Sequence, residues 1–111
     1  MGKKDHLYNI YEKSNLDRTL MQWYTDGHYY KPHEDLCIFT VITLIQLKKR
    51  RKFKGGELQF IEYDYEINLK HNQTIIFPSL VKHQVFPIKL DSNDVTDSRV
   101  TITKFIHFTS I

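Results

Sequence analysis

Short segments in which apolar and polar residues alternate make up most of the chain after Met21. Val, Ile, Thr, Tyr and Phe crowd these segments, and turn signals such as Asp26-Gly27 and Pro78-Ser79 separate them. Alternation with a period of two is typical of strands, and β-branched and aromatic residues favour extended backbone. The pattern predicts strands over residues 20–24, 29–35, 36–47, 57–69, 73–77, 83–90 and 99–108. Such short strands, separated by turns, indicate a mostly β sandwich or barrel.

Two of these segments depart from simple alternation. Residues 36–47 are almost wholly apolar, which predicts a strand covered on both faces. Residues 57–69 alternate but change phase near Phe60-Ile61, which predicts a β-bulge within one long strand.

The start of the chain has a different period. Between residues 5 and 13, Leu7, Ile10 and Tyr11 fall on one face of a helix. We therefore expect a short N-terminal helical segment, residues 1–20, followed by the β domain, residues 21–111. A chain of 111 residues is long enough for one core, so the two parts form a single domain.

Charge and cysteine content narrow the picture only a little. The net charge is +3, and much of the basic excess lies in the run Lys48–Lys54. We interpret the run as a solvated connection; the alternative is a guide for an acidic substrate or nucleic acid, although no aromatic platform accompanies it. The single cysteine, Cys37, excludes an intrachain disulfide. With no signal peptide and no span long enough for a bilayer, we expect a soluble, cytoplasmic protein.

Two metal-capable side chains stand one residue apart, at His33 and Asp35. On a strand they emerge on the same face and can share a cation. His83, which opens a later strand, is the best-placed third ligand. Two imidazoles and one carboxylate are the ligand set of non-haem Fe(II) oxygenases. For the isolated pair, a loop histidine beside a capping carboxylate is the simpler interpretation.

The last predicted strand carries an unexpected polar face. Arg99, Thr101 and Thr103 share one face and Val100 and Ile102 the other, although the strand should be buried. A guanidinium and a hydroxyl two residues apart suit a carboxylate. The simplest explanation is a polar pocket inside a barrel; a surface arginine at the start of a strand is the alternative.

Taken in order, these residues carry a family resemblance. The chain contains Tyr24-x-x-Gly27-x-x-Tyr30-x-x-His33-x-Asp35, then Gly55-Gly56-Glu57-Leu58, Ile76-Phe77-Pro78-Ser79, His83-x-Val85-x-Pro87 and Arg99-x-Thr101. This ordered set resembles the 2-oxoglutarate and Fe(II)-dependent dioxygenases of the prolyl 4-hydroxylase type. The resemblance covers the chain from about Met21 to Phe108 and implies a double-stranded β-helix, the jelly-roll or cupin-like barrel.

The resemblance also implies roles for individual residues. Most of the matched positions would hold the metal or the cosubstrate, or would shape the pocket: iron ligands His33, Asp35 and His83; 2-oxoglutarate contacts Arg99, Thr101 and Tyr24; pocket lining Tyr30, Leu44 and Val85; and a structural turn at Gly55 and Gly56. Leu44 stands where some members place a second cosubstrate-binding tyrosine. No catalytic base is implied, because the iron supplies the chemistry.

The implied activity is hydroxylation of a C–H bond, coupled to decarboxylation of 2-oxoglutarate to succinate. Fe(II), 2-oxoglutarate and dioxygen would be required, and the resemblance allows ascorbate as a reductant. The expected substrate is a protein or peptide side chain such as proline, with a free amino acid or small metabolite left open. Alternatives are a non-catalytic jelly-roll binding module and a nucleic-acid-directed protein that uses Lys48–Lys54. The short N-terminus suggests a minimal enzyme, a dimer or other partner that completes it, or a fragment.

Overall fold

The computed structural model describes residues 16–107. These residues form ten strands and two short 3₁₀ turns, Ile61–Tyr63 and Val95–Asp97. The strands are β1 Leu16–Tyr24, β2 Tyr30–His33, β3 Phe39–Ile45, β4 Lys54–Gly55, β5 Leu58–Phe60, β6 Tyr65–Ile67, β7 Thr74–Pro78, β8 His83–Val85, β9 Ile88–Lys89 and β10 Arg99–His107. The prediction of a mostly β chain is confirmed.

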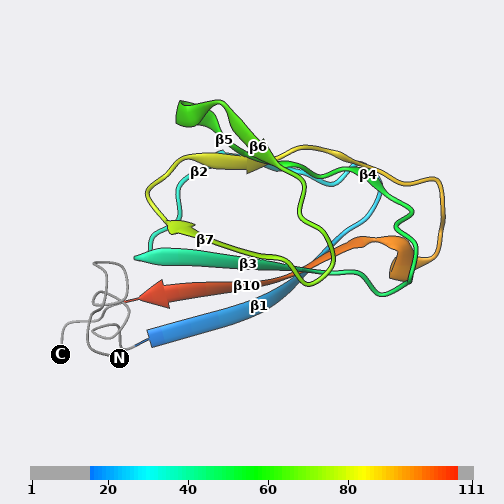
Figure 1. Ribbon diagram of the computed structural model, residues 1–111, viewed down its shortest axis with the longest axis horizontal. Coiled ribbons are helices and arrows are strands. Elements are labelled where there is room, and N and C mark those ends of the chain that lie inside the picture. Colours follow the sequence, from blue (N-terminus) through cyan, green and yellow to red (C-terminus); the bar gives the residue numbers. More distant parts are fainter. Residues whose placement is uncertain (1–15, 108–111) are drawn as a thin grey trace.

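The strands form two main sheets that face each other, as Figure 1 shows. One sheet has the order β1-β10-β3-β7 and the other the order β2-β8-β5-β6, while β4 and β9 pair at one end. All of the pairings are antiparallel. The described residues do not close into a barrel, so the expected barrel is an open jelly-roll sandwich.

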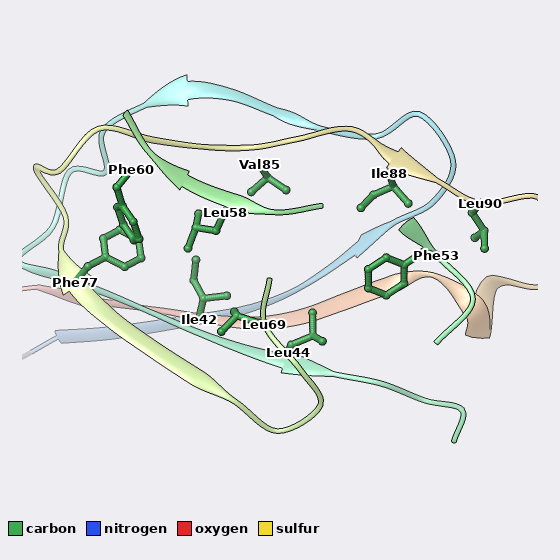
Figure 2. Close-up of a cluster of buried hydrophobic side chains, with 10 residues drawn as sticks. All are labelled: Ile42, Leu44, Phe53, Leu58, Phe60, Leu69, Phe77, Val85, Ile88 and Leu90. Atoms are coloured by element: carbon green, nitrogen blue, oxygen red, sulfur yellow. The ribbon is translucent and has the colours of Figure 1, made fainter. Parts of the chain in front are cut away.

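The two sheets pack through their inner faces. On β3, Ile42 and Leu44 point inward and are 8% and 1% exposed, and Leu58 on β5 is fully buried. Figure 2 shows the core between the layers, made by Ile42, Leu44, Phe53, Leu58, Phe60, Leu69, Phe77, Val85, Ile88 and Leu90. Burying such side chains contributes about 1.5–3 kcal/mol each. Part of the space between the sheets is lined by polar side chains from both sheets, and the candidate site lies there.

Three strand predictions need correction. Residues 57–69 form a hairpin, β5 and β6, because the chain reverses at Ile61–Tyr63 and Asp64 adopts a left-handed conformation with φ 47°. The change of phase near Phe60 therefore marks a reversal and not a bulge. Residues 83–90 form two short strands, β8 and β9. The strand within 36–47 is covered fully on one face only, since Val41, Thr43 and Ile45 are half-buried.

The predicted N-terminal helix, residues 5–13, lies outside the described residues. Residues 16–20, expected to belong to the N-terminal segment, are instead the first part of β1. The strand starts earlier than the hydrophobic pattern suggests because β1 pairs with β10 along its whole length, from Leu16–His107 to Tyr24–Arg99. Within residues 16–107, no helix has the length and apolar character needed to cross a membrane.

Candidate metal and cosubstrate site

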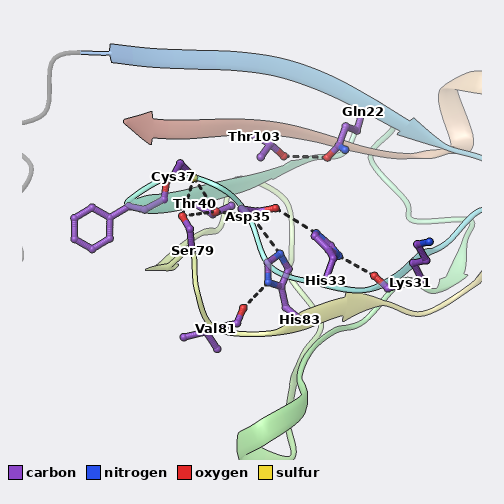
Figure 3. A network of polar contacts seen from close by, with 11 residues as sticks. Gln22, Lys31, His33, Asp35, Cys37, Thr40, Ser79, Val81, His83 and Thr103 are labelled. Carbon is purple, nitrogen blue, oxygen red and sulfur yellow. Dashed lines mark hydrogen bonds and ion pairs between the residues drawn. The ribbon is translucent and has the colours of Figure 1, made fainter. Parts of the chain in front are cut away.

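Three metal-capable side chains converge between the sheets. His33 closes β2, Asp35 follows two residues later, and His83 opens β8. His33 and His83 are paired in the sheet, with ring centroids 4.2 Å apart. The two Asp35 carboxylate oxygens lie 3.4 Å from His33 Nε2 and 3.3 Å from His83 Nε2 (Figure 3). One potential ligand atom from each residue lies within 4.8 Å of the others.

Backbone carbonyls orient both imidazoles. His33 Nδ1 is 2.8 Å from the Lys31 carbonyl oxygen, and His83 Nδ1 is 2.7 Å from the Val81 carbonyl oxygen. A carbonyl oxygen only accepts, so each Nδ1 carries a hydrogen and donates it. Nε2 of both rings is therefore left to bind a cation beside Asp35. Such outer hydrogen bonds fix the tautomer and orientation of metal-binding histidines.

A buried hydroxyl network holds the Asp35 carboxylate. Thr40 Oγ1 donates to Asp35 Oδ2 at 2.6 Å, and it lies 3.0 Å from Ser79 Oγ. Ser79 Oγ in turn lies 2.8 Å from Cys37 Sγ, and the Asp35 N–H donates to the Ser79 carbonyl. Thr40 and Ser79 are 1% and 0% exposed. The sequence analysis missed these two hydroxyls; the signal was Thr40, a polar residue on the same face of β3 as Ile42.

The titration of the site reflects this arrangement. The pKa of His33 is lowered, mainly because burial disfavours the charged imidazolium. Burial alone would raise the pKa of Asp35, but its interactions with His83 and Thr40 outweigh burial and hold that pKa below its usual value. A neutral imidazole and an ionised carboxylate are the forms that bind metal ions.

Arg99 marks the other end of the inner polar face. Its side chain is 4% exposed, and no described residue forms a hydrogen bond or ion pair with its guanidinium. The guanidinium carbon lies 5.8 Å from the ring centre of Tyr24, which faces it across the β1–β10 pair. Burial lowers the pKa of Arg99 to about 10, so it remains charged at neutral pH. A buried cation without a hydrogen-bond or ion-pair partner is costly, and it indicates a place for an anion.

One cavity of about 150 Å³ joins the two ends. It is lined by Leu20, Gln22, Tyr24, Tyr30, His33, Asp35, Thr40, Ile42, Leu58, His83, Val85, Arg99, Thr101, Thr103 and Phe105. The predicted ligands and cosubstrate contacts, together with Tyr30 and Val85, thus surround a single space. Leu44 does not line it and belongs to the hydrophobic core. The sequence analysis missed Gln22, which shares the inward face of β1 with Tyr24.

The two consecutive glycines give Arg99 and β9 their room. Gly55 and Gly56 have φ values of 77° and 74°, which L side chains rarely adopt. A Cβ at Gly55 would lie 2.1 Å from the Pro87 carbonyl oxygen, and one at Gly56 would lie 2.7 Å from Arg99 Cδ. The turn that was predicted as structural therefore packs directly beneath the Arg99 side chain.

The family model for the 2OG-Fe(II) oxygenase superfamily matches residues 19–107. This chain belongs to the 2OG-Fe(II) oxygenase superfamily. The match runs from β1 to the end of β10 and includes every residue that lines the cavity. Among curated proteins, no sequence matches this oxygenase significantly.

Solved structures support the same fold. The oxygenase chain resembles a Pseudomonas putida prolyl-4-hydroxylase, with a TM-score of 0.69 and 16% identity, over 93% of this chain and 58% of that protein. It also resembles a truncated viral collagen prolyl hydroxylase from Paramecium bursaria Chlorella virus-1, with a TM-score of 0.64 and 18% identity. That likeness covers 94% of this chain and 63% of the viral protein. The chain therefore spans about three fifths of the length of either structure.

The donor set fits the iron that the family name implies. Two imidazole nitrogens and one carboxylate, with their outer hydrogen bonds in place, are the ligands expected of a mononuclear non-haem Fe(II) site. Within residues 16–107, no other group of three or more His, Cys, Asp or Glu residues could hold a metal ion.

Two side chains of the basic run Lys48–Lys54 interact with other residues of the chain. Lys48 Nζ lies 2.8 Å from Asp94 Oδ2 and 2.9 Å from Asp97 Oδ1. The Arg51 guanidinium lies over the Phe53 ring at 4.6 Å and donates to Asn68 Oδ1. Lys48 thus forms ion pairs with the polar loop, residues 91–98, that precedes β10. These contacts favour a structural role for at least two charges of the run over nucleic-acid binding.

Proposed function

We propose that this oxygenase is an Fe(II)- and 2-oxoglutarate-dependent dioxygenase that hydroxylates an unactivated C–H bond. One observation carries the proposal. The buried, unpaired Arg99 shares a cavity with the triad of His33, Asp35 and His83. A cation-binding triad at one end and an anion-binding guanidinium at the other suit a short dicarboxylate that reaches from the metal to Arg99.

In this proposal, His33 Nε2, His83 Nε2 and one oxygen of Asp35 bind Fe(II). Thr40 keeps the second Asp35 oxygen engaged at 2.6 Å, which favours binding of the metal through the first. Fe(II), when bound, supplies the activation of dioxygen that couples oxidative decarboxylation of 2-oxoglutarate to C–H hydroxylation. The products of the cosubstrate are succinate and carbon dioxide.

Arg99 orients the cosubstrate. Its guanidinium binds the carboxylate of 2-oxoglutarate that lies farther from the metal, and Tyr24 and Thr101 flank that carboxylate from β1 and β10. Ile42 and Leu58 on the cavity wall exclude water, which strengthens the charge interaction. Holding the cosubstrate at both ends fixes its reacting carbon beside the metal ligands.

The proposed substrate is a peptidyl side chain, with proline the first candidate. The two solved structures named above are prolyl hydroxylases. Tyr30 also lines the cavity, remains 40% exposed and stacks on His33 with ring centroids 3.8 Å apart. An aromatic face beside the metal ligands suits a small apolar ring such as pyrrolidine.

Cosubstrate turnover tests the proposal. The purified protein, loaded with Fe(II) without oxygen and then exposed to air, should convert 2-oxoglutarate to succinate. The matched control carries His33→Ala and Asp35→Ala together. Turnover no higher than in this control, with a library of proline-containing peptides present, would count against a dioxygenase. A protein that takes up no stoichiometric Fe(II), Mn(II) or Co(II) would instead be a binding module.

A further inference from the structure

Gln22 lines the cavity, and it has no role in the proposed reaction described above. It lies on β1 directly opposite Thr101, between Leu20 and Tyr24, and all three β1 side chains line the cavity. Tyr24 is the partner of Arg99 in the same register. Because diagonal neighbours on one face of a sheet stand about 7–8 Å apart, Gln22 and Arg99 can contact one small ligand together.

Two buried hydroxyls form hydrogen bonds with the Gln22 amide oxygen. Thr103 Oγ1 donates to Gln22 Oε1 at 3.1 Å, and Thr101 Oγ1 donates to the same oxygen at 3.5 Å (Figure 3 shows the closer bond). These threonines are 3% and 1% exposed. Both hydroxyls donate to Oε1, so the amide oxygen lies on the β10 side.

This orientation leaves the amide nitrogen as a donor in the cavity. Nε2 is on the opposite side of the amide from Oε1, and no residue in the described range accepts a hydrogen bond from it. A side-chain amide nitrogen carries two N–H donors. The cavity thus contains a guanidinium and a pair of neutral donors on adjacent strands, with no described acceptor for either.

The geometry points to Gln22 as the second donor that binds the distal carboxylate of 2-oxoglutarate, beside Arg99, and thereby selects a dicarboxylic 2-oxo acid. The inference rests on the proposed function, because it concerns the same cosubstrate. A carboxylate has two oxygens and about four lone-pair sites, more than one guanidinium fills from one side. Thr101 and Thr103 then act by positioning Gln22, since both hydroxyls donate to Oε1.

The test measures cosubstrate binding without turnover. The full chain is loaded with Mn(II) under nitrogen and titrated calorimetrically with 2-oxoglutarate. The same protein is titrated with 2-oxopentanoate, which has the same five-carbon chain and lacks the distal carboxylate. We expect Gln22→Glu, which replaces the two N–H donors by an anion of the same shape, to weaken 2-oxoglutarate binding at least tenfold. Binding of 2-oxopentanoate should change less than twofold.

Two further variants separate a binding role from a structural one. Gln22→Met keeps the size of the side chain without its donors and should weaken 2-oxoglutarate binding three- to tenfold, which keeps the test open if Gln22→Glu does not fold. Gln73→Glu adds the same charge at an exposed turn, where an acceptor for the Lys70 N–H is retained, and should bind like the wild type.

Three outcomes would overturn the inference. Gln22→Glu and Gln22→Met could both bind 2-oxoglutarate within twofold of the wild type, which would leave Gln22 a packing residue. Equal losses for both 2-oxo acids would mean a general disturbance of the cavity. A Mn(II)-loaded wild type that binds no 2-oxoglutarate would overturn the proposed function itself, and that result is seen before any variant is made.

Discussion

The two ends of the cavity are built on opposite principles. At the metal end, formed by His33, Asp35 and His83, every side chain is held by a hydrogen bond to Lys31, Thr40 or Val81. At the anion end, formed by Arg99 and Tyr24, the guanidinium forms no hydrogen bond or ion pair with any residue in the range 16–107, although Arg99 is only 4% exposed. Under the proposed function, the metal end is organised before its ion binds. The anion end would instead hold a charge whose burial is compensated only when the cosubstrate binds.

The largest expected effect comes from removing a metal ligand. Asp35→Ala should weaken Mn(II) or Co(II) binding by more than about 100-fold, the upper end of what an outer hydrogen-bond partner contributes. The reason is that Asp35 is the only anionic member of the triad. Calorimetric titration of the metal-free protein measures the loss. Glu34→Ala, which removes the neighbouring exposed carboxylate, should leave metal affinity unchanged. Equal effects of the two substitutions would contradict the assignment of the metal end.

The second largest effect is expected for Arg99→Met, which should weaken cosubstrate binding without lowering the stability of the unliganded protein. Arg99→Met should weaken 2-oxoglutarate binding to the metal-loaded protein by about 3–5 kcal/mol, the typical loss when a buried charge pair loses one partner. Without ligand, the same variant should be as stable as the wild type or about 1–4 kcal/mol more stable, since a buried unpaired charge has been replaced by an apolar chain. Urea unfolding and ligand titration measure the two effects.

Arg51→Met is the matched control for Arg99→Met. Arg51 is half-buried, and it donates to Asn68 Oδ1 and stacks on Phe53. Its removal should lower the free energy of unfolding by about 1–3 kcal/mol and weaken 2-oxoglutarate binding far less than Arg99→Met does, because the Arg51 charge acts on Arg99 only from a distance. If Arg99→Met destabilises the unliganded protein as Arg51→Met does, the anion end contains a partner for Arg99 and the comparison between the ends fails.

A smaller effect tests how the metal end is organised. Thr40→Val removes the 2.6 Å hydrogen bond to Asp35 Oδ2 and the 3.0 Å contact with Ser79 Oγ, which keeps Cys37 Sγ as a partner. Metal affinity should fall by about 10–100-fold, the range for outer partners of metal ligands. Thr40→Ser keeps the hydroxyl and should restore most of the affinity. At saturating metal, 2-oxoglutarate should bind both variants like the wild type; a loss that Thr40→Ser does not restore would assign Thr40 to packing.

The sequence predicted the residues at both ends of the cavity, but it did not predict the residues that support them. The side-chain alternation of extended backbone predicted which residues of His33-x-Asp35 and Arg99-x-Thr101-x-Thr103 share a face, although β2 ends at His33 and Asp35 lies in the connection that follows it. The order of the motifs along the chain, which matches the family, predicted that these residues share one cavity. Thr40, Ser79 and Gln22 were missed because their roles depend on which strands become neighbours. Pairing between distant segments is a tertiary property that no local pattern encodes.

The errors in the fold have a similar origin. The reversal at Ile61–Tyr63 and a bulge both interrupt alternation, and the sequence could not separate them because Asp64 tolerates the left-handed conformation without being a glycine. Leu44 was assigned to the pocket by its motif position, yet its side chain is 1% exposed in the core. Residues that match a family pattern still follow the packing of their own chain.

The smallest expected effect on ligand binding concerns the backbone beneath the anion end. At Gly56, φ is 74°, and a Cβ would lie 2.7 Å from Arg99 Cδ and 2.5 Å from Ile88 Cδ1. Gly56→Ala should therefore lower the free energy of unfolding by about 1–3 kcal/mol through backbone strain, plus the cost of displacing these side chains. It should also weaken 2-oxoglutarate binding severalfold, because Arg99 must move, while metal affinity stays the same. Thermal or urea unfolding and the two titrations measure these effects.

Gly27→Ala separates backbone strain from contact with Arg99. Gly27 has φ 82°, and a Cβ there would meet nothing within 4 Å. This substitution should cost only about 1–2 kcal/mol, the penalty of a left-handed L residue, with no change in 2-oxoglutarate binding. If both alanine variants bind 2-oxoglutarate equally well, the position of Arg99 does not depend on Gly56. Ligand binding at the anion end would then tolerate changes around Arg99, whereas metal binding depends on the residues that hydrogen-bond to the metal ligands.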